Sequence, residues 1–205
     1  MRMTASSDPL TAIAWPLRTP RLTIRRARPA DDAVVWTYRS DPVVSRWLGA
    51  APESAEAFST YFHAPHRLAT TLIIELAGAQ PVVIGDLMLK VEDEWAQAEV
   101  AAAASGTGAE LGWVLDPAYA GRGYATEAVR AMIDAAFTQA GLRRVHAGCF
   151  AENTPSWRVM ERLGMRREEH SRRTALHRSG VWMDGMNYAL LADEWGTGGP
   201  TVPAG

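Results

Sequence analysis

The stretch from Glu110 to Ala140 most constrains the fold, because it joins a strand, a glycine turn and a helix without interruption. The strand candidate "ELGWVLD", residues 110–116, is mostly apolar and ends at Pro117, which cannot continue a central strand. After the turn, apolar residues recur at the spacing of an amphipathic helix: Ala128, Val129, Met132, Ile133, Ala136 and Ala140. A strand followed at once by such a helix is a building unit of α/β proteins.

The other patterns extend this unit into a mixed sheet. Alternating or β-rich runs predict strands at 21–27, 70–77, 82–91 and 143–150, and two more within 165–194 around the turn His177–Gly180. Helices are predicted after Pro29, from Glu53, and from Thr154 as N-cap with Pro155 at the first helical position. The alanine-rich segment 92–109 is predicted to be a loop or a frayed strand extension. About seven strands flanked by helices indicate an α/β fold.

One domain accommodates all of these elements. The chain has 205 residues and is 47% hydrophobic, enough for a single sizeable core. We expect the ordered domain at 17–195, a poorly structured N-terminal segment at 1–16, and a flexible Gly/Pro tail at 196–205.

Charge and composition argue against several classes of partner. The 21 basic and 23 acidic residues give a net charge of −2 and are spread along the chain, which disfavours nucleic acid. Cys149 is the only cysteine, which fits a reducing, cytoplasmic setting. The sequence shows no long apolar run or leader pattern, so no membrane partner is expected. The histidines have no metal-ligand spacing, so we expect no metal.

The turn Gly121-Arg122-Gly123 opens the long helix, and such a helix start favours a phosphate-bearing ligand. It lacks the Gly-Lys-Ser/Thr of a Walker loop, which argues against phosphoryl transfer. It also lacks the third glycine of a dinucleotide turn, where Thr126 stands, and the acidic residue about twenty positions on. Coenzyme A, whose pyrophosphate needs only backbone amides, is the third option.

Longer stretches around this turn resemble a known family. "ELGWVLDPAYAGRGYATEAVRAMIDAAF" and "RVHAGCFAENTPSWRVMERLGM" are similar to the GCN5-related N-acetyltransferases (GNAT), in particular to the branch that acetylates the N-termini of ribosomal proteins. "TPRLTIRRARPADD" and "WMDGMNYALLADEW" resemble the same branch, so the resemblance covers residues 18–195. It implies a single-domain GNAT-like fold with a mostly antiparallel sheet, acetyl-CoA as cosubstrate and an amine as acceptor.

The resemblance also assigns the cosubstrate site. The family motif Gln/Arg-x-x-Gly-x-Gly/Ala falls on residues 120–125, where Ala120 departs from the pattern. Asn153 matches the asparagine that contacts the pantetheine arm, and Trp113, Val114 and Leu115 would pair with that arm as a substitute strand. The pyrophosphate would bind the main-chain amides of Gly121, Arg122, Gly123, Tyr124, Ala125 and Thr126. Because amides bind phosphate without a particular side chain, Ala120 should weaken the site rather than abolish it.

Two further positions are implied as catalytic. The glutamate and tyrosine used by many family members are replaced here by Gly148 and Met160. The ribosomal-protein branch instead uses a glutamate on the strand before the glycine turn and a serine three residues after the asparagine. These fall on Glu110, which would assist deprotonation of the amine directly or through water, and Ser156, which would donate to the leaving thiolate.

The resemblance implies an acetyltransferase that moves acetyl directly from acetyl-CoA to a protein N-terminus or a small amine in a ternary complex. Homodimers are usual among similar proteins. We expect the acceptor pocket around Trp47, the helix from Glu53 and the Trp182 region. Gly148 and Met160 keep a second hypothesis open, a non-catalytic acyl-CoA-binding module, and an interaction protein that merely retains the fold is a third.

Overall fold

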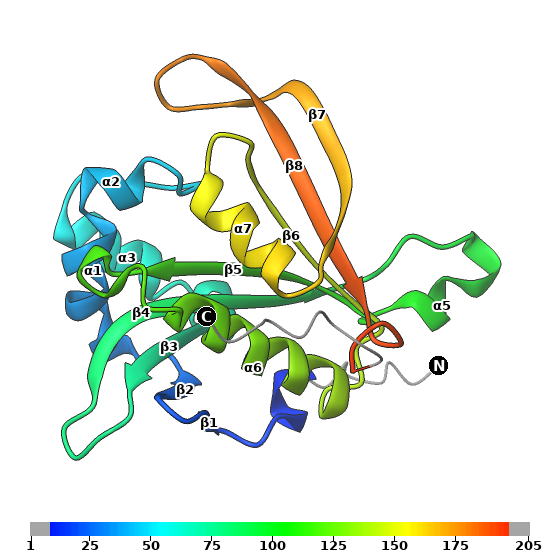
Figure 1. Ribbon diagram of the computed structural model, residues 1–205, viewed down its shortest axis with the longest axis horizontal. Helices are drawn as coiled ribbons and strands as arrows, with labels where there is room; N and C mark the ends of the chain where they lie inside the picture. The colour runs from blue at the N-terminus through cyan, green and yellow to red at the C-terminus, as the bar shows by residue number, and fades with distance from the viewer. Residues whose placement is uncertain (1–8, 197–205) are drawn as a thin grey trace.

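In the computed structural model, residues 9–196 are described and form one sheet with helices on both faces (Figure 1). Its strands, in the spatial order β1-β2-β3-β4-β5-β6-β8-β7, are β1 (Leu17–Arg18), β2 (Leu22–Arg26), β3 (Thr71–Leu76), β4 (Val82–Glu92), β5 (Gly108–Leu115), β6 (Arg144–Phe150), β7 (Arg166–Leu176) and β8 (Trp182–Leu191). The sheet has 8 strands instead of about seven because the two-residue β1 is too short to leave a sequence pattern. The predicted α/β class is confirmed.

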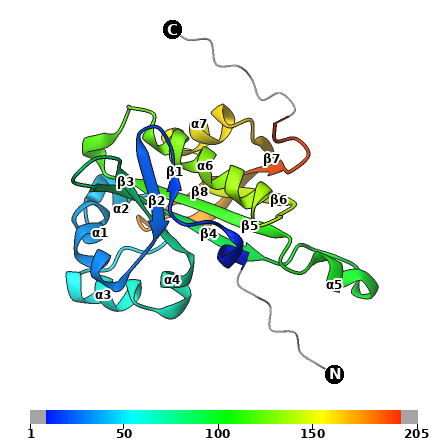
Figure 2. The same cartoon turned by 90° about the horizontal axis from the view of Figure 1, so that it is seen from below.

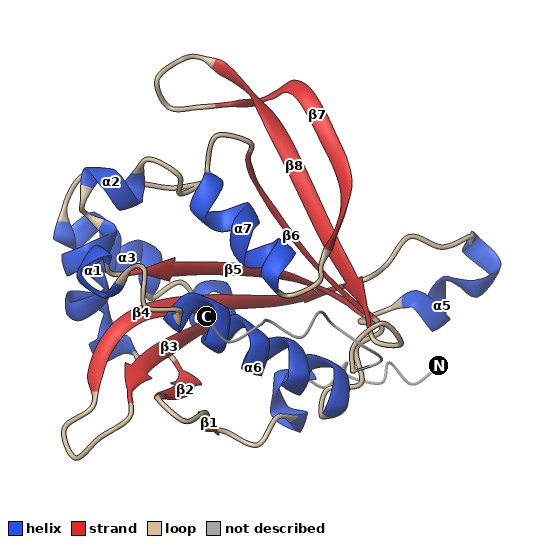
Figure 3. Ribbon diagram, viewed as in Figure 1, coloured by secondary structure: helices blue, strands red, loops and turns tan. Residues whose placement is uncertain are grey.

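Of the seven helices in the described part of the chain, four lie where the sequence predicts them, and the three shortest, of four to six residues, were not predicted. The seven helices are α1 (Asp32–Arg39), α2 (Pro42–Ser45), α3 (Ala55–Phe62), α4 (Pro65–Thr70), α5 (Ala101–Ala104), α6 (Tyr124–Thr138) and α7 (Thr154–Arg162), with short 3-10 turns η1 (Pro9–Ala12), η2 (Pro29–Asp31), η3 (Ala98–Val100) and η4 (Pro117–Tyr119). Figure 3 separates these helices from the strands by colour. None of the helices between residues 9 and 196 has the length and apolar character needed to cross a membrane.

Two hydrophobic cores lie on opposite faces of the sheet. The larger core packs α6 and α7 onto one face, with Leu87, Leu111 and Met132 fully or almost fully buried. The smaller core packs α1 and α3 onto the other face around Val35, Phe58 and Val114. Figure 2 shows α6 and α7 on one side of the sheet and α1, α3 and α4 on the other. Alternating side chains of β5 therefore enter different cores.

Three local predictions need correction. The segment 9–16 is ordered, because Leu10 and Ile13 are buried against the larger core and the Trp15 indole donates to the Leu10 carbonyl at 2.9 Å. Helix α7 has Asn153 as its N-cap, one residue earlier than expected, so Thr154 is its first helical residue. Residues 92–109 hold η3 and α5 between the two strands, rather than only a loop. Residues 1–8 and 197–205 lie outside the described part of the chain.

Candidate functional site

Strands β5 and β6 pair only at their beginnings. Their register, the one parallel pairing among the described strands, runs from Gly108 opposite Arg144 to Glu110 opposite His146 and stops there. Beyond this point the two strands diverge, as Figure 1 shows. Residues 111–115 still pair with β4 on one edge, but their other edge has no neighbouring strand. The backbone groups of that edge can therefore bind an extended ligand, as an added strand would.

The glycine turn lies at the end of this edge. Gly121 and Gly123 have φ of 75° and 78°, a region that L-residues adopt only at a cost. Gly123 is the N-cap of α6, so the amides of the first helical turn have no carbonyl partner within the helix. Ala120, in contrast, has ordinary extended angles and is exposed. The turn thus presents backbone donors suited to an anion.

A side-chain brace that no pattern in the sequence indicates holds this turn. The Arg21 guanidinium donates from Nε to Oε2 of Glu127 at 2.7 Å and from Nη1 to the Arg122 carbonyl at 3.0 Å. It also lies 4.5 Å from the centre of the Tyr124 ring. Thr19 Oγ1 donates to the other Glu127 oxygen at 2.6 Å. We call these four side chains, Thr19, Arg21, Tyr124 and Glu127, the turn brace.

The turn brace changes the charge balance of the anion site. Burial alone would raise the pKa of Glu127, but the hydrogen bonds from Thr19 and Arg21 outweigh it and lower that pKa. The carboxylate is therefore ionised and paired, and it does not act as a free negative charge beside the turn. Only a pairing between segments 106 residues apart creates this arrangement, so no local pattern signals it.

Helix α7 presents the next two predicted residues. Asn153 caps the helix through its backbone, and its carbonyl accepts from the Ser156 amide at 3.0 Å. Ser156 precedes the buried Val159 and Met160 by three and four positions, so it lies on the inward face of the helix. Neither the Asn153 amide nor the Ser156 hydroxyl makes a side-chain hydrogen bond within residues 9–196. Both remain available to a ligand, and their roles stay predictions.

Glu110 lies on the opposite face of the sheet from α7. It is aligned with Lys90 on one side and His146 on the other, whereas its neighbours Ala109 and Leu111 are buried in the core under α6 and α7. Its side chain is half-buried and has no ion pair or hydrogen bond with the described residues. The two predicted catalytic residues, Glu110 and Ser156, are thus on different faces, and the gap between β5 and β6 connects these faces.

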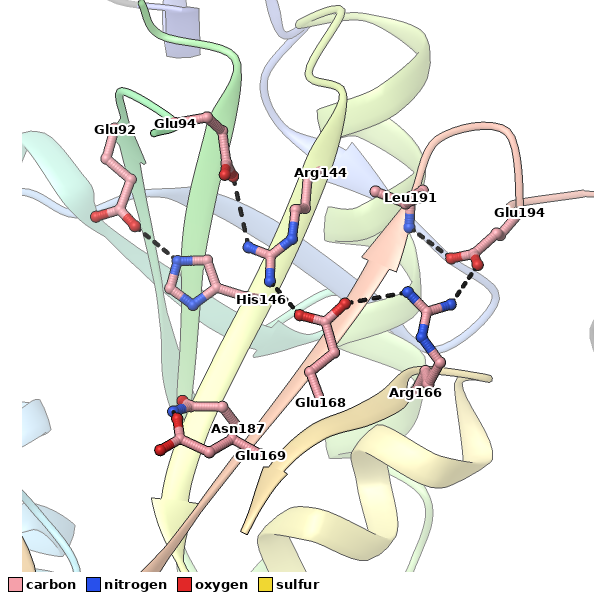
Figure 4. A network of polar contacts seen from close by, with 10 residues as sticks. All are labelled: Glu92, Glu94, Arg144, His146, Arg166, Glu168, Glu169, Asn187, Leu191 and Glu194. Carbon is pink, nitrogen blue, oxygen red and sulfur yellow. Dashed lines mark hydrogen bonds and ion pairs between the residues drawn. The ribbon is translucent and has the colours of Figure 1, made fainter. Parts of the chain in front are cut away.

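The other charged groups at the closed end of this gap are mutually paired (Figure 4). His146 Nε2 lies 2.6 Å from a Glu92 oxygen, which leaves the second oxygen 3.3 Å from Lys90 Nζ. Arg144 binds Glu94 and Glu168, and the latter also binds Arg166 at 3.0 Å. This network ties β4, β6 and β7 together near the point where β5 and β6 begin to diverge. It leaves Glu110 as the unpaired acid beside the gap.

Three aromatic rings, which we call the aromatic arch, lie at the open end of the gap on the face that carries Glu110. The rings of Trp47, Phe150 and His177 pack with centroid separations of 5.5–5.8 Å. His177 Nε2 lies 2.9 Å from the Arg46 carbonyl, and Arg178 binds the Leu48 carbonyl. This arch joins the segment after α2 to the β7–β8 turn. Trp47 therefore bounds the expected acceptor region, whereas Trp182 is 55% exposed.

Two pockets lie near these elements. The larger, about 740 Å³, runs along α6 from Glu127 to Asp134 and ends at Gly164 and Trp195, outside the gap between β5 and β6. The smaller, about 50 Å³, lies on the face that carries Glu110, between α3, α4 and β4. Within residues 9–196, no three His, Cys, Asp or Glu side chains are grouped to hold a metal ion.

Comparison with known proteins agrees with this geometry. An uncharacterised N-acetyltransferase of Bacillus licheniformis, p20, is 30% identical over 162 residues, which cover 74% of this chain and 83% of that protein. The crystal structure of a GNAT-family acetyltransferase from Bacillus anthracis superposes with a TM-score of 0.73 at 30% identity, covering 87% of this chain and 99% of that one.

Two Bacillus subtilis proteins match a shorter part. The uncharacterised N-acetyltransferase YnaD is 42% identical over 86 residues, and the putative ribosomal N-acetyltransferase YdaF is 36% identical over 87 residues. Each match covers 42% of this chain, and the chain spans about half of each relative, 50% and 47%. The family model described as "Acetyltransferase (GNAT) domain" matches residues 21–166. The chain belongs to the GNAT acetyltransferase family.

Proposed function

We propose that this protein transfers an acetyl group from acetyl-CoA to a primary amine. The observation that carries the proposal is the free edge of β5, which leads into a turn with unpaired backbone donors. Pantetheine contains amides that can pair with residues 113–115, and pyrophosphate is the anion that the turn 121–126 suits. A ligand that combines an extended amide arm with a pyrophosphate fits both features at once.

Asn153 and Ser156 complete the cosubstrate site in this proposal. Both lie at the start of α7, and both have polar side-chain groups without a hydrogen-bond partner among the described residues. The Asn153 amide would bind the pantetheine arm beyond the end of the β5–β6 pairing. The Ser156 hydroxyl, on the inward face of α7, would donate to the sulfur when the thioester carbon–sulfur bond breaks.

The acceptor amine approaches from the face that carries Glu110. Its nitrogen attacks the thioester carbon, the carbonyl oxygen becomes an oxyanion, and a β5 backbone amide near Val114 stabilises that oxyanion. Glu110 accepts the amine proton directly or through water, and collapse of the intermediate releases the thiolate of CoA. Direct transfer through the gap between β5 and β6 accounts for an acid on one face and a hydroxyl donor on the other.

The demand on Glu110 depends on the amine. An α-amine with a pKa of about 8 is roughly one-tenth neutral at pH 7, whereas a lysine with a pKa of about 10.4 is neutral in less than about one molecule in a thousand. A carboxylate is a weak base in general, so we propose a protein N-terminus or a small amine, which needs less help to lose its proton, as acceptor. We also propose a cytoplasmic homodimer, from the cysteine content and the family usage.

The test measures free thiol released from acetyl-CoA in the presence of a panel of amines. We expect amine-dependent release that falls about 10²-fold or more in Glu110→Gln, a loss within the range of general base catalysis. Asp134→Asn, on the exposed side of α6, is the matched control and should leave the rate unchanged. Tight CoA binding without turnover on any amine would instead favour an acyl-CoA-binding module, the reading suggested by Gly148 and Met160.

A further inference from the structure

The smaller pocket lies beside Glu110 on the acceptor face. Its walls are Phe58, Tyr61 and Phe62 of α3, Arg67 of α4, and Asp86 and Met88 of β4. A volume of about 50 Å³ exceeds the roughly 10–15 Å³ that one water needs, so a small polar group fits. A pocket of this size with an apolar lining alone would stay empty of water. Its charged residues therefore determine which polar group binds there.

The acid of this pocket, Asp86, already has hydrogen-bond partners within the protein. Asp86 is 1% exposed and accepts from the Tyr38 hydroxyl at 2.8 Å and from Arg39 Nε at 2.9 Å. Arg39 Nη2 donates to the second carboxylate oxygen at 2.5 Å, which makes the pair bidentate. Burial raises the pKa of Tyr38, and the neighbouring Asp86 raises it further, so that its hydroxyl stays a donor. The Arg39–Asp86 pair contributes no net charge to the pocket.

The cation Arg67, in contrast, has no counter-ion among residues 9–196. Its guanidinium stacks on the Tyr61 ring at 4.5 Å, and its Nε is buried without a hydrogen bond. No side chain among the described residues accepts a hydrogen bond from it. A buried donor without an acceptor is costly, and a charged one more so. The pocket therefore carries one net positive charge and a donor that lacks its acceptor.

The strand register places this pocket next to Glu110. Met88 is paired with Gly112, and the following pair on the same face is Lys90 with Glu110. Gly112 has no side chain to block the path between them, and a Cβ there would already lie 3.6 Å from Met88. Two residues along a strand span about 7 Å, so the Met88 end of the pocket lies about that far along the sheet from Glu110.

We infer that the acceptor carries a carboxylate about 7 Å from its amine and that Arg67 binds this carboxylate. The inference rests on the proposed acetyl transfer. A peptide whose second residue is Asp or Glu can reach this separation, whereas the α-carboxylate of a free amino acid, or the side chain of an N-terminal Asp, lies too close to the amine. A guanidinium can donate two parallel hydrogen bonds to a carboxylate, so such a group supplies the acceptor that Arg67 Nε lacks.

The experiment compares kcat/KM on matched peptides with Asp, Ser or Lys at the second position. A charge-assisted hydrogen bond is worth about ten- to hundredfold in this ratio. We expect the Asp peptide to exceed the Ser peptide by at least tenfold and the Lys peptide by more. In Arg67→Gln the advantage of the Asp peptide should disappear, while the Ser peptide and the KM for acetyl-CoA stay within about twofold to threefold. Arg67→Lys should retain part of the preference.

Arg130→Gln is the control, since Arg130 lies over Trp195 at 5.5 Å on the other face of the sheet, and it should keep the full preference. Equal losses on Asp and Ser peptides in Arg67→Gln would show a purely structural role and overturn the inference. Turnover without preference for an acidic peptide would overturn the inference and leave the proposed function intact. Absence of turnover with every amine would overturn both.

Discussion

Replacement of Gly123 by alanine perturbs the turn through its backbone alone. The residue has φ of +78°, and a Cβ built on it meets only the Arg21 Nη2 atom at 3.5 Å, an ordinary contact. Steric overlap is therefore absent, and the cost is the left-handed conformation itself, about 1–2 kcal/mol for an L-residue. Gly141→Ala is the matched control, because Gly141 has φ of +67° at the end of α6 with no atom near its Cβ.

The strain must reappear either in unfolding of the free protein or in binding of CoA. The Gly121–Gly123 segment is exposed, and the turn brace bonds its backbone only at the Arg122 carbonyl, so we expect the free turn of the variant to relax and the ligand to restore the strained form. Gly123→Ala should then raise the Kd for CoA about 5- to 30-fold, the equivalent of 1–2 kcal/mol. Gly141→Ala should leave the Kd unchanged and lower Tm by about 2–8 °C.

Isothermal titration calorimetry with CoA and thermal melts of both variants check this partition. The two variants introduce the same kind of strain at different sites. Gly123→Ala should therefore change mainly the Kd for CoA, and Gly141→Ala should change mainly Tm. A Kd within twofold of the unaltered protein in Gly123→Ala would refute the assignment of this turn to the pyrophosphate. An equal loss of CoA affinity in Gly141→Ala would refute the argument from local strain.

Other predictions follow from individual contacts. Arg21→Gln removes the turn brace and should raise the KM for acetyl-CoA about 3- to 10-fold while the acceptor KM stays constant, because solvent screens this half-exposed group. Burial raises the pKa of Cys149 to about 11, so its alkylation by iodoacetamide at pH 7.5 should be at least about 10²-fold slower than that of a free thiol. Burial would raise the pKa of Asp31, but hydrogen bonds from Arg25 and Arg28 lower it, so its stabilisation exists above its unfolded pKa and is lost as pH falls through the folded one. Asp31→Asn should thus lower Tm at pH 7, with a difference from the unaltered protein that shrinks below about pH 3; a constant difference would contradict the pairing.

Elements with continuous local patterns could be predicted from the sequence. The six apolar positions of α6 repeat at helical spacing and all are buried, except for the partly buried Ala140 beyond its end. The glycine turn could also be predicted, because positive φ angles are adopted readily only by glycine and two glycines stand at this turn. The start of α7 was displaced by one residue because both Asn153 and Thr154 are capping residue types.

Features that depend on distant contacts could not be predicted. Leu10 and Ile13 show no periodicity, and their burial results from docking beside α6, where the Ala14 amide donates to the Gln139 side chain at 2.8 Å. The pairing of Arg21 with Glu127 and the unpartnered Arg67 arise in the same way, from segments brought together by the sheet. Sequence alone therefore indicated the segments proposed to bind the cosubstrate and the helix from Glu53 on the proposed acceptor face, whereas the turn brace and the unpartnered Arg67 emerged only from the fold.

Amide hydrogen exchange with and without saturating CoA tests the placement of the cosubstrate most directly. The free β5 edge and the first turn of α6 have amides without protein partners, so a ligand bound there should slow their exchange. The amides of β5 alternate between its two edges, and the Asp116 amide donates to the Ile84 carbonyl of β4, so the Trp113 and Leu115 amides face the free edge. We predict protection at these two amides and at residues 121–126, with no change in β7. Protection confined to the larger pocket between α6 and Trp195, with residues 111–126 unchanged, would contradict the assignment of the gap between β5 and β6 to CoA.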